Sequence, residues 1–207
     1  MRVIAGKFRS RPLRSLRGMD LRPTADRLRE TLFNVLSAGN PAVFEDTAWL
    51  DLCAGTGAVG IEALSRGAVK VYFVESSAAA ATLIRQNLHS LGVPDRFEVV
   101  KEDVTCALPK LEARNVTANF IFLDPPYCLE KIYVEVLQLL SQSSLLAPDA
   151  VLVVEHDKRF DPGDGPAPLQ RYRKLQQGDA VLSFYRLARW PESRAGQALS
   201  SNSDTTS

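Results

Sequence analysis

The sequence has little of what metal centres, disulfide frameworks and membrane spans require. It contains three cysteines, Cys53, Cys106 and Cys128, and two histidines, His89 and His156. Widely spaced cysteines in odd number indicate neither a disulfide framework nor a zinc knuckle, and so few soft ligands argue against a metal site. No apolar run approaches the length that crosses a bilayer, and the arginine-rich start lacks the apolar stretch of a secretory signal. We therefore expect a cytoplasmic protein with no metal and no membrane partner.

Net charge is close to zero, but it is unevenly distributed along the chain. The 207 residues carry a formal net charge of +1, whereas residues 1–30 hold nine basic and three acidic side chains. A basic segment on a mildly acidic body indicates a polyanionic partner that is contacted locally, although a merely solvated segment would have the same composition.

The hydrophobic pattern predicts alternating strands and helices after a short amino-terminal region. Strands are expected at 47–53, 70–75, 96–101, 118–124 and 149–155, and helices at 57–67, 77–91, 104–112 and 129–142. Such alternation, with continuous apolar strands, is typical of a mainly parallel sheet that helices cover on both faces. A final antiparallel hairpin is expected around Gly178 and Asp179. The fold class is therefore α/β.

Three regions are expected along the chain. Residues 1–40 form a basic arm and a helix that Thr24 caps, and "RVIAGKFRSRPL" within them forms a short hairpin or an irregular arm. Residues 41–190 form the α/β domain. Residues 191–207 are rich in Ser, Thr and Asn and are expected to be a disordered tail.

The segment "LDLCAGTGAVGIEAL" predicts a ligand-binding loop between the first strand and its helix. Its glycines permit a tight turn and the close approach of a ligand to the backbone. Glu75, at the end of the next strand, stands where a carboxylate binds ribose hydroxyls, which suits a nicotinamide dinucleotide as well as other nucleosides. Asp51 would repel a pyrophosphate but suits the ammonium and sulfonium of S-adenosylmethionine. Asp103 is placed to accept from an adenine amino group, although any one of these acids could instead cap a helix.

The segment "FIFLDPPYCLE" ends a buried strand with an acid, two prolines and a tyrosine. If the substrate is an exocyclic amino group of a nucleobase, Asp124 and the carbonyl of Pro125 can accept from its two N–H groups and favour a tetrahedral nitrogen. The Pro-Pro step removes competing backbone donors and keeps the chain extended. Tyr127 can then stack on the base. A turn that merely ends the strand is the structural alternative.

Together, "LRPTADRLRETLFNVL", "DLCAGTGAVGIEALSRGA" and "FLDPPY" resemble the RsmD family of bacterial 16S rRNA guanine(966)-N(2)-methyltransferases. "RVIAGKFRSRPL" and "GDAVLSFYRL" fit the same family, so the resemblance covers roughly residues 2–187. It implies a Rossmann-like methyltransferase fold with a seven-stranded sheet and S-adenosylmethionine as cofactor. The implied substrate is a guanine of 16S rRNA within the small ribosomal subunit or its assembly intermediate. We expect the protein to act as a monomer.

The resemblance also assigns roles by position. The residues expected to bind the cofactor are Asp51, Ala54, Gly55, Gly57, Glu75, Asp103, Val104 and Thr24, and those expected at the target base are Asp124, Pro125, Pro126 and Tyr127. The basic arm is expected to contact RNA phosphates through Arg2, Lys7, Arg9, Arg11, Arg14 and Arg22.

Two other functions are compatible with these motifs. DPPY suits any exocyclic amine, so a DNA N6-adenine methyltransferase is one alternative, although only residues 1–40 precede the core and no separate target-recognition domain is evident. The other is a non-catalytic RNA-binding assembly factor that keeps the fold without the chemistry.

Overall fold

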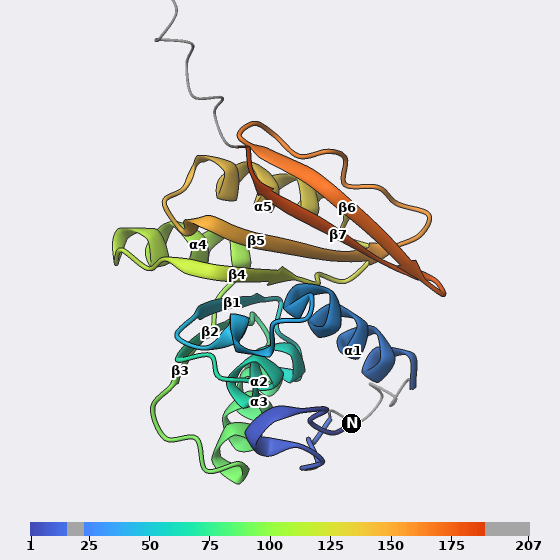
Figure 1. Ribbon diagram of the computed structural model, residues 1–207. Helices are drawn as coiled ribbons and strands as arrows, with labels where there is room; N and C mark the ends of the chain where they lie inside the picture. The colour runs from blue at the N-terminus through green and yellow to red at the C-terminus, as the bar shows by residue number, and fades with distance from the viewer. Residues whose placement is uncertain (16–22, 189–207) are drawn as a thin grey trace, which may run out of the picture.

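The computed structural model describes residues 1–15 and 23–188, without the side chains of residues 23–25 (Figure 1). The elements in chain order are η1 (Gly6–Phe8), α1 (Pro23–Ser37), η2 (Pro41–Phe44), β1 (Ala48–Leu52), α2 (Ala58–Ser65), β2 (Lys70–Val74), α3 (Ala78–Ser90), β3 (Phe97–Val100), α4 (Val104–Ala113), β4 (Ala118–Leu123), α5 (Glu130–Gln142), β5 (Leu146–Asp157), β6 (Leu169–Gln177) and β7 (Ala180–Leu187). The predictions for Arg22, for the side chain of Thr24 and for the tail at 191–207 lie outside the described residues. None of the described helices is long and apolar enough to cross a membrane.

Seven strands form one sheet in the order β3-β2-β1-β4-β5-β7-β6. The pairs among β1 to β5 are parallel, whereas β7 pairs antiparallel with both β5 and β6. The predicted α/β class, the mainly parallel sheet and the final hairpin are confirmed. Because parallel strands point the same way, the carboxyl ends of β1, β2, β4 and β5 meet at one edge of the sheet.

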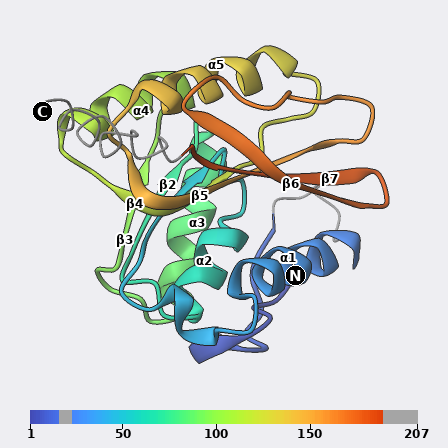
Figure 2. The same cartoon turned by 45° about the horizontal axis from the view of Figure 1, so that its top comes forward.

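Helices cover both faces of the sheet. Figure 2 shows α1, α2 and α3 on one side and α4 and α5 on the other. Neighbouring residues of one strand belong to different cores: Trp49 packs in the core with α1 to α3, and Leu50 in the core with α4 and α5. Burial on both faces explains why these strands are continuously apolar in the sequence.

Aromatic stacking fixes α1 against the sheet. The ring of Phe33 stacks on Trp49 with centroids 5.4 Å apart, and Trp49 stacks on Phe120 at 4.6 Å. Phe33 lies in the second half of α1 and Trp49 near the start of β1, so the first half of α1 extends toward the carboxyl edge of the sheet. Leu28 and Arg29 there line a cavity beside that edge.

Two elements differ from the expectation in extent or form. β5 runs from Leu146 to Asp157, longer than the predicted 149–155, because it pairs with β4 at its first residue and with β7 at its last. The segment "RVIAGKFRSRPL" combines the two forms expected for it: an irregular 3-10 turn joins two flanks that are paired like a hairpin, by the antiparallel bridge Arg2–Pro12 and by backbone hydrogen bonds such as Val3 N–H to the carbonyl of Arg11.

The arm, residues 1–15, has one apolar and one basic side. Val3, Phe8 and Leu13 are buried in the core on the α1 to α3 face. The basic side chains of the arm are all exposed, namely Arg2, Lys7, Arg9, Arg11 and Arg14. The arm is therefore part of the folded body and presents its positive charge outward.

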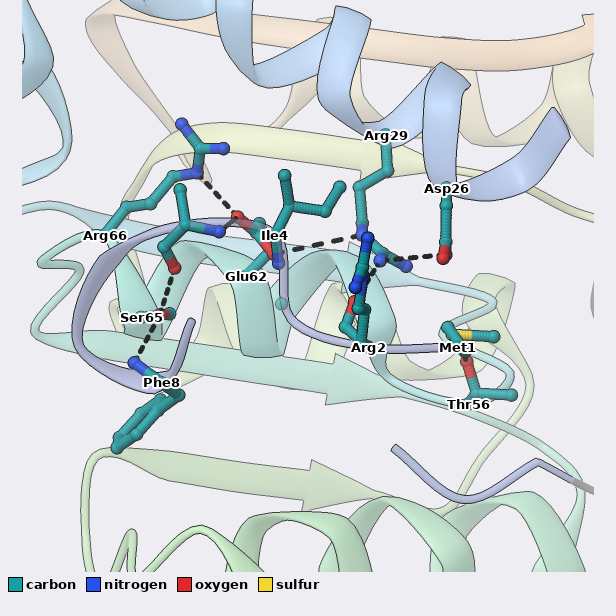
Figure 3. A network of polar contacts seen from close by, with 12 residues as sticks. Met1, Arg2, Ile4, Phe8, Asp26, Arg29, Thr56, Glu62, Ser65 and Arg66 are labelled. Carbon is teal, nitrogen blue, oxygen red and sulfur yellow. Dashed lines mark hydrogen bonds and ion pairs between the residues drawn. The ribbon is translucent and has the colours of Figure 1, made fainter. Parts of the chain in front are cut away.

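Glu62 of α2 holds the arm in place (Figure 3). Its carboxylate, which is fully buried, accepts from the backbone N–H of Ile4 at 2.8 Å and of Ala5 at 2.9 Å. It also accepts from Nε of Arg66 at 2.8 Å, and Nε of Arg29 lies 4.0 Å from its other oxygen. A carboxylate with several buried partners cannot be neutralised without leaving those donors unsatisfied.

We expect Glu62→Gln to lower the free energy of unfolding by about 3–5 kcal/mol, because it removes one partner from a buried charged network. Denaturant unfolding measures this change. Limited trypsin digestion should also cleave the variant faster after Lys7, Arg9 and Arg14. The matched control is Glu102→Gln, which breaks a partly exposed pair with Lys110 and should cost at most about 1 kcal/mol. Equal stability losses in the two variants would contradict the role of Glu62.

Candidate active site

A loop with alternating left-handed residues leads from β1 into α2. Cys53, Gly55 and Gly57 have φ values of 59°, 54° and 75°. Glycine adopts this conformation readily, whereas other residues are strained in it. The predicted glycine loop is therefore present as a tight turn at the carboxyl edge of the sheet.

The glycines of the loop and of the first turn of α2 have different structural roles. A Cβ on Gly60 would lie 2.4 Å from Cε1 of Phe73, and one on Gly57 would lie 3.0 Å from Cγ1 of Ile84. These two glycines allow α2 to lie close to β2 and α3. A Cβ on Gly55 would meet only the carbonyl oxygen of Cys53 at 4.0 Å. Gly55 thus borders open space, where its missing side chain leaves room for a ligand.

Two acids, Glu75 and Asp51, accept hydrogen bonds from backbone N–H groups of the loop and of the helix that follows it. Glu75 accepts from the N–H of Gly55 at 2.8 Å and from the N–H of Ser77 at 2.7 Å. Asp51 is buried and accepts from the N–H of Gly60 at 2.8 Å. Burial raises the pKa of Asp51 to about 7, against the lowering effect of the bond from Gly60, because a buried carboxylate loses its hydration. A cationic ligand beside Asp51 would favour its ionised form.

Two spaces meet at this edge of the sheet. The groove has a volume of about 670 Å³ and is lined by Gly55, Glu75, Ser77, Asp103, Val104, Asp124, Pro125, Pro126, Tyr127 and Glu155 among others. The cavity has a volume of about 220 Å³ and is lined by Leu28, Arg29, Asp51, Ala54, Gly55, Thr56, Asp124 and Glu155 among others. Asp124 and Glu155 line both spaces, so they stand where the two meet.

Asp103 also caps a helix. Its Oδ1 accepts from the N–H of Thr105 at 2.9 Å and from the hydroxyl of Thr105 at 2.7 Å, at the start of α4. Its side chain is exposed to the groove. The capping alternative and a ligand contact are compatible, because the described bonds use only one of the two carboxylate oxygens.

The DPPY segment leaves the end of β4 and enters α5. The backbone N–H of Asp124 donates to the carbonyl of Leu52 at 3.3 Å, which ties this turn to β1. The carbonyl of Pro125 has a side-chain donor that the sequence did not reveal, because the hydroxyl of Tyr133 donates to it at 3.3 Å. A carbonyl oxygen has two lone pairs, so it can accept a second hydrogen bond.

Sequence reasoning missed two charged residues of the site. Glu155, near the end of β5, accepts from the hydroxyl of Tyr127 at 3.1 Å. Burial raises the pKa of Glu155 to about 7, and burial together with Glu155 raises the pKa of Asp124 well above its usual range. Glu155 had a signal in the sequence, because it is an acid that follows the apolar run "VLVV". The same arrangement marked Asp124 after "FIFL".

Arg29 is the second missed residue. It is the only basic side chain that lines the cavity in the described part of the chain, and it is buried. One terminal nitrogen donates to the carbonyl of Arg2 at 2.6 Å and to Asp26 at 3.1 Å, while its Nε has no hydrogen-bond partner. The guanidinium thus pairs with Asp26, lies 4.0 Å from the carboxylate of Glu62 and places a positive charge at the wall of the cavity.

Most of the residues predicted for the cofactor and the base lie together around the two spaces, whereas Gly57 lies beneath the loop against Ile84. The exposed arginines and lysine of the arm lie outside both. Fold and loop define the class: the sheet with its C-terminal hairpin is that of methyltransferases with a Rossmann-like fold, among them solved structures that are 30% identical to this chain.

The chain belongs to the family described as Conserved hypothetical protein 95, the RsmD family, whose pattern matches residues 1–186. Ribosomal RNA small subunit methyltransferase D of Escherichia coli strain K12 is 33% identical over 195 residues, which cover 94% of each chain. YlbH of Bacillus subtilis strain 168 is 33% identical over 186 residues, which cover 90% of this chain and 98% of that protein. The solved structure of YhhF from Escherichia coli superposes with a TM-score of 0.77 at 30% identity and covers 92% of this chain and 99% of that one. The predicted family is confirmed.

The different tasks of the glycines give a test. We expect Gly60→Ala to lower the free energy of unfolding by about 1–3 kcal/mol, because its Cβ overlaps buried Phe73. Gly55→Ala should cost only the strain of a left-handed residue, about 1–2 kcal/mol, since no packed atom opposes its Cβ. Denaturant unfolding measures these losses of stability. Gly55→Ala should fold but should fail to bind S-adenosylhomocysteine. A Gly55→Ala variant that binds ligand normally would contradict the assignment.

Proposed function

We propose that this protein is an S-adenosylmethionine-dependent rRNA methyltransferase that modifies the exocyclic amino group of a guanine in the small ribosomal subunit. The observation that carries the proposal is the placement of Asp124 where an acid-lined groove and a cavity meet, with Pro125 next to it in the wall of the groove. The guanine in question is position 966 of 16S rRNA, N2-methylated, as in the RsmD family. The name of its relative, Ribosomal RNA small subunit methyltransferase D, supports the rRNA substrate.

The residues of the site suit S-adenosylmethionine. The two spaces are lined by the acids Asp51, Glu75, Asp103, Asp124 and Glu155, which favour a cationic ligand and oppose a pyrophosphate. Gly55 leaves the loop backbone open to the ligand, and Glu75 retains lone pairs for ribose hydroxyls beyond its two bonds to N–H groups. When bound, the cofactor supplies a methyl group activated by a positive sulfonium.

The arrangement of the acids orients the cofactor. Glu75, Asp103 and Val104 line the groove and would hold the adenosine end. Asp51 and Arg29 line the cavity beyond Gly55 and would hold the ammonium and the carboxylate of the other end. Buried Asp51 would thereby gain a cationic partner, and Arg29, which already pairs with Asp26, would gain a further anionic one.

Asp124 and Pro125 prepare the amine for attack. The lone pair of an exocyclic amine is delocalised into the base, so the amine is a weak nucleophile. Two acceptors bonded to its two N–H groups favour a tetrahedral nitrogen, which directs the lone pair out of the ring system. The hydroxyl of Tyr133 fixes the Pro125 carbonyl on its other lone pair. Holding the reacting atoms in this geometry supplies much of the acceleration.

Asp124 also suits the proton that the nitrogen loses as its new bond to carbon forms. Burial and the neighbouring Glu155 raise the pKa of Asp124, which makes its carboxylate a better base than one in water. The positive charge of the bound cofactor lowers that pKa and keeps the group ionised until the base arrives. Tyr127, whose side chain is exposed beside Asp124, can stack on the base.

The arm supplies a contact for the RNA backbone. Its five exposed basic residues project from a segment that buried apolar residues and Glu62 fix to the body. Such contacts position a nucleic acid without reading its sequence, so the arm would place the subunit and the site would select the base.

Incubation of the protein with labelled S-adenosylmethionine and small subunits that lack the modification should place the label in the amino group of the target guanine. We expect Asp124→Asn to slow this transfer by about 10²–10³-fold, because it removes the charge aimed at the reacting nitrogen, while cofactor binding is largely kept. The matched control Asp95→Asn alters an exposed acid outside both spaces and should be fully active.

Nucleoside mass mapping and calorimetric titration of the cofactor supply the readouts. No label in guanine despite confirmed cofactor binding would count against the proposed function. Label in adenine of duplex DNA would favour an N6-adenine methyltransferase, and full activity of Asp124→Asn would contradict its catalytic role.

Two ligands, with and without a carboxylate, separate the proposed contact of Arg29 with the cofactor from its structural contacts. We expect Arg29→Gln to weaken S-adenosylhomocysteine by about 10–100-fold, the value of a charge-assisted hydrogen bond. Binding of decarboxylated S-adenosylhomocysteine should change much less, because that ligand lacks the anionic group. Arg66→Gln, which removes the other arginine bonded to Glu62 and lies outside the cavity, is the control. Equal losses for both ligands in Arg29→Gln would refute the contact.

A further inference from the structure

Glu155 lies beside the proposed reacting centre, and the chemistry derived above gives it an effect on Asp124 but no contact with the base. Leu123 of β4 pairs with Val154 of β5 in parallel register, so Asp124 and Glu155 each follow one member of a pair. Neighbouring strands are about 4.8 Å apart, which brings the two carboxylates side by side at the edge of the sheet. Both line the groove and the cavity.

The bonding of Glu155 leaves an acceptor available. The hydroxyl of Tyr127 donates to Oε1 of Glu155 at 3.1 Å, and no described bond uses Oε2. No basic side chain in the described part of the chain forms an ion pair with Glu155, and Arg29 in the same cavity is bonded to Asp26 and Arg2 instead. A half-buried carboxylate without a cation is costly, and its retention is expected where a ligand donates to it.

The edge of the target base supplies such a donor. In guanine, the carbon that bears the exocyclic amine lies between two ring nitrogens: N1, which carries a hydrogen and is a donor, and N3, which is an acceptor, so that a carboxylate on the N1 side of the amine meets a donor. In adenine and cytosine, the ring nitrogen next to the exocyclic amine is an acceptor. A carboxylate beside the amine therefore bonds to guanine and repels the other two bases, because two acceptors face each other.

We propose that Glu155 selects guanine by accepting a hydrogen bond from its N1–H through Oε2, while Asp124 and the Pro125 carbonyl accept from the amine. Tyr127 acts as a positioning residue: its hydroxyl fixes the carboxylate of Glu155, and its ring covers the base. The inference rests on the proposed function and deepens it, because DPPY alone suits any exocyclic amine. The neighbouring Glu155 is the group that distinguishes guanine from other bases with an exocyclic amine.

Buried polar groups that bind a substrate donor reject analogues without it more strongly than apolar pockets reject a missing methylene. The discrimination should therefore be large for this one atom. It should also disappear when the carboxylate is replaced by an amide, since the amide of Gln can turn either its oxygen or its NH₂ toward the base.

The test uses small subunits reconstituted with ligated rRNA that carries either guanine or 2-aminopurine at the target position. 2-Aminopurine keeps the amine at the same place but has an acceptor at N1. Single-turnover transfer from labelled S-adenosylmethionine is measured for the wild type, Glu155→Gln and the control Glu135→Gln, an exposed residue of α5 outside both spaces. S-Adenosylhomocysteine affinity and thermal unfolding are measured for each variant.

We expect the wild type and Glu135→Gln to prefer guanine over 2-aminopurine. In Glu155→Gln this preference should fall by about 10–100-fold, through slower transfer to guanine, with unchanged S-adenosylhomocysteine affinity. An unchanged preference in Glu155→Gln, with slower transfer to both bases alike, would overturn the role of Glu155 and leave the proposed function standing. No transfer to guanine by the wild type would overturn the proposed function itself.

Tyr127→Phe is the second variant and serves if Glu155→Gln does not fold. It keeps the ring over the base and removes only the hydroxyl that fixes Glu155. We expect its preference for guanine to fall several-fold, by the loss of one positioning hydrogen bond. A preference equal to that of the wild type would contradict the positioning of Glu155 by Tyr127.

Discussion

The crowding of carboxylates at one edge of a parallel sheet is the constraint on which the site depends. Asp51, Glu75, Asp103, Asp124 and Glu155 come from five different strand ends and face two connected spaces. Burial and the nearby charge of Glu155 together raise the pKa of Asp124. Backbone N–H groups of the glycine loop, the Ser77 N–H and the Tyr127 hydroxyl stabilise them in part. The rest of the compensation is left to a cationic ligand and a base with donors.

Helix α2 connects this site to the basic arm, the surface that we propose to face the RNA. The N–H of Gly60 bonds to Asp51 beneath the loop, and Glu62, two residues later, holds the arm through backbone bonds to Ile4 and Ala5. The close approach of α2 to β2 at Gly60 therefore sets the position of the glycine loop and of the arm. A rigid connection of this kind places the basic side of the arm at a fixed distance from the reacting centre.

The sequence predicted the sheet because buried parallel strands are continuously apolar and the glycine loop has a fixed place between β1 and α2. It did not predict the long β5, whose ends depend on pairing with distant strands. Glu62 looks like an ordinary helix residue, and only its partners 57 and 58 residues away make it a buried anchor. Glu155 and Arg29 were missed for the same reason, since a single charged residue acquires meaning only from neighbours that the fold brings to it. The Tyr133 hydroxyl on Pro125 is also a tertiary contact.

The clamp on the arm also bears on the order in which this protein matures during synthesis. Ile4 and Ala5 leave the translating ribosome well before Glu62 and Arg66, the residues that complete their anchor, have been added. Val3, Phe8 and Leu13 must likewise wait for the helices that bury them. The arm therefore docks only once α2 and the helices around it have formed, so its position depends on the fold of the body and not on its own local structure.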